Sequence, residues 1–393
     1  MPILALLSLL AAFPPLAIDM YLPSIPILQC LWGVPYSVVS HSLILFLATF
    51  SIFLLIHGPL SDRFGRRPVL MGGILLFILG SGGCATANSV TTFLWARAIQ
   101  GAGAAAASSL SLALTKDLFK GHNRQKILGY VGVIMTFCPM IAPSLGVVVL
   151  NCLSWRWIFL FQILVALVSF YGVYRLKEPL VEFTKGGAIS VAKRYITVFK
   201  NVRFTVLATA FALVVLPHFG FIGGAADIYI NGFGMSEQVF GVYFAINALG
   251  FMVGSFVCTL LCNTLNPLSI LYSSLLTIMG SGLLMHILGG TAPWTMALPM
   301  ICISFSVGFS RPVANSMILD QVDKDVGAAS GIMTFEMFFV AAIAVEIISL
   351  EWSNKPLVLG SLALAGAFFP LAVLLAVRRK VRQVPKRNSG ASS

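Results

Sequence analysis

The sequence predicts an all-α polytopic membrane protein with twelve transmembrane helices in two six-helix bundles. Of its 393 residues, 58% are hydrophobic and only 10% are charged, whereas water-soluble domains have about 25% charged residues. So few polar side chains would not cover a water-soluble core of this size. The apolar runs are continuous and approach the roughly 20 residues that a helix needs to cross a bilayer, which favours helices over the alternating strands of a membrane barrel.

Twelve apolar segments fit the length of a membrane-spanning helix. No basic residue precedes the first segment, and it continues into Asp19, Tyr21 and Pro23, so we expect a retained span rather than a cleaved signal peptide. The predicted spans lie near residues 3–22, 37–57, 69–87, 91–113, 125–149, 155–174, 204–229, 238–261, 268–289, 294–318, 327–349 and 356–377.

Lysine and arginine gather in every second loop. Of the loops expected on the other side, only two contain such a residue, Arg156 and Lys355. By the positive-inside rule, we expect a multi-pass membrane protein with both termini in the cytoplasm. The net charge of +12 therefore reflects topology, and nucleic acid is not an expected partner because the basic residues lie in short loops.

A basic segment divides the chain into two groups of six spans, which is typical of transporters built from repeated bundles. We expect an N-terminal bundle over residues 1–174, a basic cytoplasmic linker over 175–203, a C-terminal bundle over 204–377 and a basic cytoplasmic tail over 378–393. Apolar and basic residues alternate in the linker. It therefore either lies on anionic lipid or is an ordinary linker kept inside by its charges.

Ionisable side chains within predicted spans are functional candidates, because a charge there costs roughly 2.5–3.5 kcal/mol at the helix centre. Asp19 lies late in the first span and is a candidate proton carrier, the alternative being a silent acid at the outer interface. Arg97 lies in the fourth span and stays charged, so it would pair with polar groups of the first span or bind backbone carbonyls. Glu336, near the middle of the eleventh span, would meet a cationic substrate or Arg311.

Polar and aromatic side chains in several spans are candidates for contacting a substrate. Gln100 lies one turn after Arg97 on the same helix face. The candidate substrate-binding residues are Tyr21, Gln100, Tyr243, Asn247, Asn315, Phe335 and Glu336.

The loop after the second span reads GPLSDRFGRRP over residues 58–68. Its one acid lies among three arginines at a helix end, where a charge network would latch helices together, and an ordinary positive-inside loop is the alternative. The run resembles the G-x-L-x-D-R-x-G-R-[KR] signature of the major facilitator superfamily. The resemblance implies that superfamily's fold. The expected conformational latch consists of Gly58, Asp62, Arg63, Gly65, Arg66 and Arg67.

Three more segments are similar to motifs of the bicyclomycin/chloramphenicol-resistance (Bcr/CflA) group of drug:proton antiporters. They are IDMYLP at 18–23, RAIQGAGA at 97–104 and PMIAPSLG at 139–146. The resemblance implies proton coupling by Asp19 and Arg97. It also implies an antiporter motif of Pro139, Pro143 and Gly146. The prolines lack backbone N–H donors and the glycine leaves a small surface, so the helix would bend there. The alternative is a kink without mechanistic meaning.

These features predict a secondary transporter that works by alternating access. The resemblance implies that it lies in the bacterial inner membrane and exports amphipathic, drug-like compounds in exchange for protons. We expect a monomer whose partners are a small-molecule substrate, protons and the lipid bilayer, with no cofactor beyond the proton gradient and no metal. The sequence contains no GxxxxGK[ST] run of an ATP-driven pump and no HxxxxD, HExxH or GxSxG motif of a membrane-embedded enzyme. The alternative is a transporter of a specific metabolite or siderophore on the same fold. Asp227, Arg311 and Glu336 depart from the group's pattern and leave the substrate open.

Overall fold

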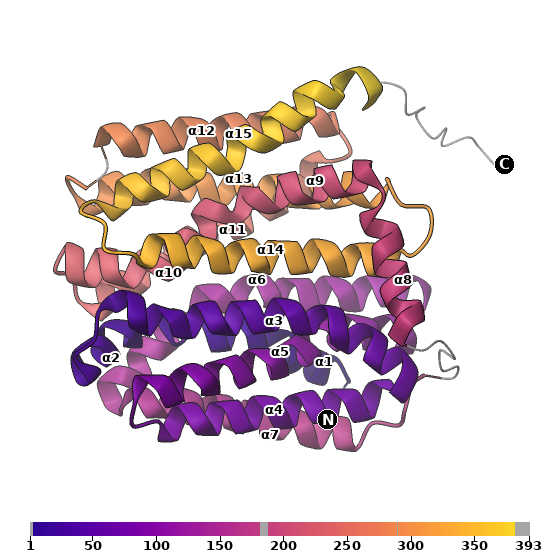
Figure 1. Cartoon of the computed structure of the whole chain (residues 1–393), viewed down its shortest axis with the longest axis horizontal. Helices are drawn as coiled ribbons and strands as arrows, with labels where there is room; N and C mark the ends of the chain where they lie inside the picture. Colours follow the sequence, from indigo (N-terminus) through magenta and orange to yellow (C-terminus); the bar gives the residue numbers. More distant parts are fainter. Residues whose placement is uncertain (1–2, 181–187, 289, 382–393) are drawn as a thin grey trace.

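The computed structural model describes residues 3–180, 188–288 and 290–381, which are almost wholly helical and contain no β-strand (Figure 1). The predicted all-α class is thus confirmed. Eleven helical segments within these ranges are long and apolar enough to cross a membrane. They are Ile3–Trp32, Tyr36–Phe64, Arg66–Thr86, Asn123–Cys152, Trp155–Tyr174, Val202–Gly232, Glu237–Leu261, Pro267–Leu288, Pro293–Leu319, Val326–Ser349 and Lys355–Ala376.

The remaining predicted span, 91–113, lies in helix α5 (Val90–Leu118). Its 29 residues suffice to cross a bilayer, but Arg97, Gln100 and the glycines and serines that follow make it less apolar than the other eleven. The same small residues let its neighbours approach closely, so α5 packs against both α3 and α4 (Figure 1).

The first half of the chain forms one group of helices (Figure 1). The first span continues to Trp32 instead of ending near residue 22, because Pro26 lies in the first turn of α2, where a proline removes no needed hydrogen bond. The helices of this half are α1 (Ile3–Ile18), the short η1 (Leu22–Ser24), α2 (Ile25–Trp32), α3 (Tyr36–Phe64), α4 (Arg66–Thr86), α5, α6 (Gly121–Cys152) and α7 (Trp155–Tyr174).

The second half forms the other group, and its first span is again interrupted. Helices α9 and α10 are joined by a short turn, and α10 runs into a π-helical turn, η3. The elements are α9 (Val202–Ala212), η2 (Leu213–Val215), α10 (Leu216–Ala226), η3 (Asp227–Gly232), α11 (Glu237–Leu261), α12 (Pro267–Leu288), α13 (Pro293–Leu319), α14 (Val326–Ser349) and α15 (Lys355–Val381).

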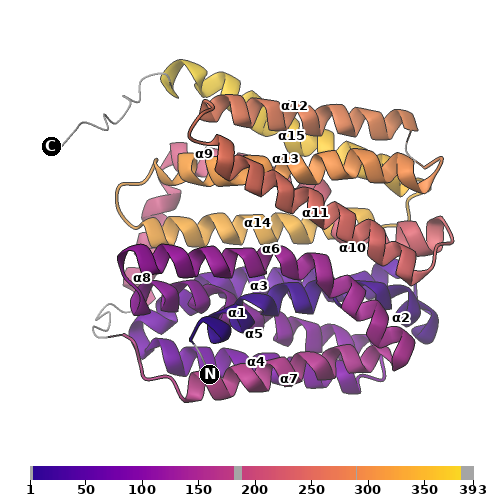
Figure 2. The ribbon, with the colours of Figure 1, turned by 180° about the vertical axis from the view of Figure 1, so that it is seen from behind.

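Two helix pairs join the groups: α3 packs beside α14, and α6 beside α11 (Figures 1 and 2). Within the predicted linker, α8 (Ala188–Phe199) runs across one end of the molecule, where the Tyr195 hydroxyl donates a 3.1 Å hydrogen bond to the carbonyl of Leu55. We call this the basic end, because the arginine-rich loop at Gly65 also lies there; α2 and η3 mark the opposite end. Most of the predicted tail, from residue 382 onward, lies outside the described residues.

Glycines set the contact between α11 and α13. A Cβ added at Gly254 would overlap the backbone of Phe305, and one added at Gly308 would overlap the carbonyl oxygen of Phe251 and lie 3.1 Å from the amide nitrogen of Ser255. The two helices therefore touch backbone to backbone.

Replacing Gly308 with alanine is expected to destabilise the protein by about 1–3 kcal/mol, because overpacking forces the two backbones apart. Gly280→Ala is the matched control, since a Cβ there meets nothing within 4 Å while the helix gains the same backbone rigidity. The measurement is the melting temperature of the detergent-purified protein, and equal values for the two variants would contradict this account of the contact.

Candidate functional site

The core of the N-terminal half contains a fully buried cation, Arg97 of α5. The last carbonyls of a helix have no partner within the helix, and α1 ends at Ile18. The Arg97 Nη1 atom donates a 3.0 Å hydrogen bond to one of these carbonyls, that of Ala17, and also donates to Oε1 of Gln100. Arg97 therefore binds a backbone carbonyl of the first span, as the second of the two sequence interpretations expected, and does so at the negative end of α1.

Aromatic rings surround the same guanidinium. Its central carbon lies 4.7 Å from the ring centroid of Tyr21 and 4.6 Å from that of Phe46, distances typical of cation–π contacts. The Tyr21 hydroxyl makes a 2.8 Å hydrogen bond with that of Ser42. Nε and Nη2 of Arg97 are buried without a hydrogen-bond partner among the described residues, so the rings stabilise a charge that is only partly satisfied.

Two glutamines extend the contact into a network of four helices. Nε2 of Gln100 donates to the Ser81 hydroxyl at 2.8 Å and to Oε1 of Gln162 at 2.7 Å. In turn, Nε2 of Gln162 donates a 2.9 Å hydrogen bond to the carbonyl of Leu16, another free carbonyl at the end of α1. This set, which we call the Arg97 network, joins α1, α4, α5 and α7.

Asp19 lies directly beyond α1, in the turn before η1, and is only 4% exposed. Among the described residues, no ion pair includes its carboxylate. It therefore forms no salt bridge with Arg97, although Arg97 holds the carbonyl two residues before it.

One residue of the predicted antiporter motif, Gly146, packs onto this same turn. A Cβ added at Gly146 of α6 would overlap the carbonyl of Met20 and lie 3.2 Å from Pro23. Pro139 and Pro143 lie inside α6, which continues through both as one helix. The structure thus brings Asp19, Arg97 and Gly146 to one place, the break in the first span.

The predicted latch joins helices at the basic end. Arg66 contacts Oδ1 of Asp62 at 2.5 Å and Oδ2 of Asp117, at the end of α5, at 2.8 Å. Oε1 and Oε2 of Glu178 accept the backbone amides of Arg66 and Arg67 at 2.9 and 3.0 Å. All these partners belong to the first half of the chain, so the loop ties α3, α4, α5 and the end of α7 together.

The remaining latch positions have different surroundings. Gly65 has a φ of +99°, which a side chain would strain, and Glu178 fills the space beside it. Arg63 is exposed and lies over the ring of Phe64, and a Cβ at Gly58 would meet nothing within 4 Å. Sequence reasoning missed Asp117 and Glu178. The sequence signal for each of them would have been a single acidic residue next to a basic one, close to the end of a helix.

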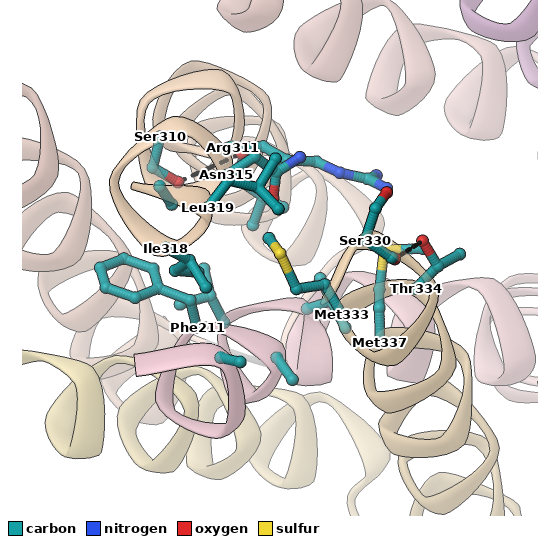
Figure 3. A pocket seen from close by; sticks show the side chains of 16 residues that line it. Phe211, Ser310, Arg311, Asn315, Ile318, Leu319, Ser330, Met333, Thr334 and Met337 are labelled. Carbon is teal, nitrogen blue, oxygen red and sulfur yellow. Dashed lines mark hydrogen bonds between the residues drawn. The ribbon is translucent and has the colours of Figure 1, made fainter. Parts of the chain in front are cut away.

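A cavity opens among α9, α13 and α14 in the second half (Figure 3). Its volume is about 690 Å³ including the space at its mouth, and it lies toward the basic end, since Leu319 at the end of α13 lines it. Of the seven candidate substrate-binding residues, Asn315 alone is among the 16 described residues that line it.

The other six candidates lie elsewhere. Tyr21 and Gln100 are fully buried in the Arg97 network. Tyr243 stacks on Tyr229 at 4.8 Å between centroids, and Phe335 stacks on Phe339 at 5.6 Å. Asn247 is buried with Oδ1 lacking a partner among the described residues.

Glu336 faces α9 rather than this cavity. Its Oε1 accepts a 3.2 Å hydrogen bond from the Thr209 hydroxyl, and its Oε2 is buried without a partner among the described residues. No ion pair between Glu336 and Arg311 occurs there, although the sequence allowed one.

At the opposite end, polar contacts connect the two halves. The Tyr36 hydroxyl donates a 2.8 Å hydrogen bond to the carbonyl of Gly223. Lys355 pairs with Asp227 at 2.5 Å and lies 4.9 Å from the centroid of the Tyr36 ring. Asp227 is thus neutralised beside a contact between the two halves at this end.

Two groups of membrane-length helices, a buried charge network and a polar cavity between helices define a polytopic membrane transporter. The family model of the Major Facilitator Superfamily matches residues 7–345, and the chain belongs to this superfamily of transporters. The predicted superfamily is therefore confirmed.

Individual relatives agree with this assignment. The MFS-type transporter YdgK of Bacillus subtilis is 29% identical over 378 residues, which cover 92% of this chain and 94% of YdgK. The bicyclomycin resistance protein homolog of Haemophilus influenzae is 26% identical over 356 residues, 87% of each chain. The solved structure of the xylose transporter XylE from E. coli has a TM-score of 0.71 at 15% identity and covers 99% of each chain, which confirms the predicted fold.

Replacing Gln162 with leucine is expected to cost about 1–3 kcal/mol, the penalty for leaving a buried carbonyl, here that of Leu16, without a donor. Gln125→Leu, at an exposed position of α6, is the matched control. Thermal unfolding in detergent measures the difference. A Gln162 variant as stable as the control would show that the network contributes nothing to the fold.

Proposed function

We propose that this protein exports amphipathic, drug-like compounds from the cytoplasm in exchange for inward-moving protons. The observation that carries the proposal is the placement of Asp19, a buried carboxyl group without an ion pair among the described residues, at the break in the first span. A carboxyl group so placed can take up a proton without breaking a salt bridge. The similarity to a bicyclomycin resistance protein homolog supports a drug as the substrate.

The mechanism we propose is alternating access, in which the two halves move around the cavity and expose it to either side of the membrane. Protonation of Asp19 would change its contacts beside Met20, where Gly146 of α6 packs closely. Because α6 also packs against α11, a change at Asp19 can reach the second half directly. Proton binding and substrate binding would then favour opposite states of the same equilibrium between inward-open and outward-open protein, so each weakens the binding of the other.

The Asp62–Arg66–Asp117 contacts would keep the first half rigid during this movement. In this proposal the basic end faces the cytoplasm of a bacterial cell, in the inner membrane, and one chain suffices for transport. Support for the orientation comes from the bias of lysine and arginine toward that end.

The test of transport uses proteoliposomes with an imposed pH gradient and a panel that includes bicyclomycin, chloramphenicol, a cationic dye, an amphipathic organic acid and common metabolites. We expect several compounds to move against the direction of proton flow, and movement to stop when the gradient is collapsed. Uptake of one metabolite alone would favour the alternative of a narrow-range transporter. No gradient-dependent movement of any panel compound would contradict drug:proton exchange.

Asp19→Asn is expected to abolish gradient-driven export, because asparagine has nearly the same shape but cannot carry the proton. The same variant should still exchange labelled for unlabelled drug without a gradient, since the substrate site and the fold remain. Asp320→Asn, at an exposed acid after α13, is the control and should export normally. Full gradient-driven export by Asp19→Asn would eliminate Asp19 as the proton carrier.

A further inference from the structure

We propose that the cavity among α9, α13 and α14 selects amphipathic organic anions, and that Arg311 binds their carboxylate. This inference rests on the proposed transport function and names the substrate class of that cavity. Among the 16 residues that line it, Arg311 alone carries a charge at every pH of interest, and none is acidic.

Arg311 has no counterion in the protein. None of the ion pairs among the described residues includes it, and no hydrogen bond of its side chain is found there. The residue lies eight positions before the end of α13, about 12 Å along the axis at 1.5 Å per residue. A cation at this depth needs an anionic partner, and because the protein supplies none, we assign that role to a ligand bound in the cavity.

Neighbouring acids do not supply it. Glu336 bonds to Thr209 of α9, and its carboxylate is outside the cavity wall. Asp325, in the loop before α14, lies 3.9 Å from Arg194 of α8 instead. The positive charge of Arg311 is therefore the dominant charge within the cavity.

Two further donors complete an anion site. Asn315 lies one turn after Arg311 on the same face of α13, and Figure 3 shows the Arg311 side chain extending toward Ser330 of α14. Within the described residues, neither the Asn315 amide nor the Ser330 hydroxyl forms a hydrogen bond, whereas the Thr334 hydroxyl donates to the carbonyl of Ser330 at 2.8 Å. A carboxylate at Arg311 thus has a planar guanidinium and two free donors within one cavity.

The rest of the wall is apolar and adaptable. Phe211, Met333 and Met337 line it below these donors (Figure 3). Methionine side chains adjust to varied shapes, so this wall can fit apolar bodies of different outline. The chemistry that fits is a small acid with an aromatic or aliphatic body.

Three fluorescent probes with one common body test this inference: dansylglycine, dansylamide and dansylcholine, which are anionic, neutral and cationic at pH 7.5. Fluorescence titration of the purified full-length protein in nanodiscs, without any gradient, gives their dissociation constants. We expect dansylglycine to bind about tenfold more tightly than dansylamide, the scale of one charge-assisted hydrogen bond, and dansylcholine to bind weakest.

In Arg311→Gln, dansylglycine should lose this preference while dansylamide binds as before, which also shows that the variant is folded. Arg311→Lys should retain part of the preference, because lysine keeps the charge but not the planar fork. Arg194→Gln, which removes a half-exposed cation of α8, is the matched control and should behave as wild type.

Equal binding of the three probes, absence of binding, or an unchanged preference in Arg311→Gln would each overturn the assignment. Because the measurement needs no proton gradient, its outcome is independent of drug:proton exchange. Anion preference without exchange would refute the proposed transport cycle alone, and exchange without anion preference would refute this inference alone.

Discussion

The free carbonyl groups at the end of α1 are the constraint on which the N-terminal half depends. A helix that stops inside a membrane leaves its last carbonyls without water to bind them, so other helices have to supply donors. Arg97 and Gln162 supply two of them, from α5 and α7. The same two side chains hold α5 and α7 beside α1, and they contact the buried Gln100 and the ring of Tyr21.

The two halves use arginine differently. Arg97 is enclosed by rings and carbonyls and completes the protein's own structure. Arg311 lines a cavity and has no counterion among the described residues. Both side chains are costly inside a membrane. The protein itself offsets this cost for Arg97 but not for Arg311. In the mechanism we propose, the first half therefore works around the break beside Asp19 and the second half around the cavity.

The sequence predicted the helices well, because membrane length and continuous apolar character are local properties; the span at 155–174 coincides with α7. It also marked Asp19, Arg97 and Gly146, which the fold brings together at one turn. It did not predict Glu178 at the start of α4, because the two are more than one hundred residues apart along the chain. Nor did it place Tyr21, whose direction depends on the break after Ile18.

Helix α6 packs against α1 and α7 but belongs to neither of the two polar networks of its own half. The Arg97 network joins α1, α4, α5 and α7, and the contacts of Arg66 and Glu178 join helices at the basic end, but neither includes α6. Helix α6 is also the least buried span of this half, with 24% of its apolar window inside the protein. A displacement of α6 relative to α1, α4, α5 and α7 would therefore break no hydrogen bond of the Arg97 network and no ion pair of Arg66, while it would be passed to α11, against which α6 packs.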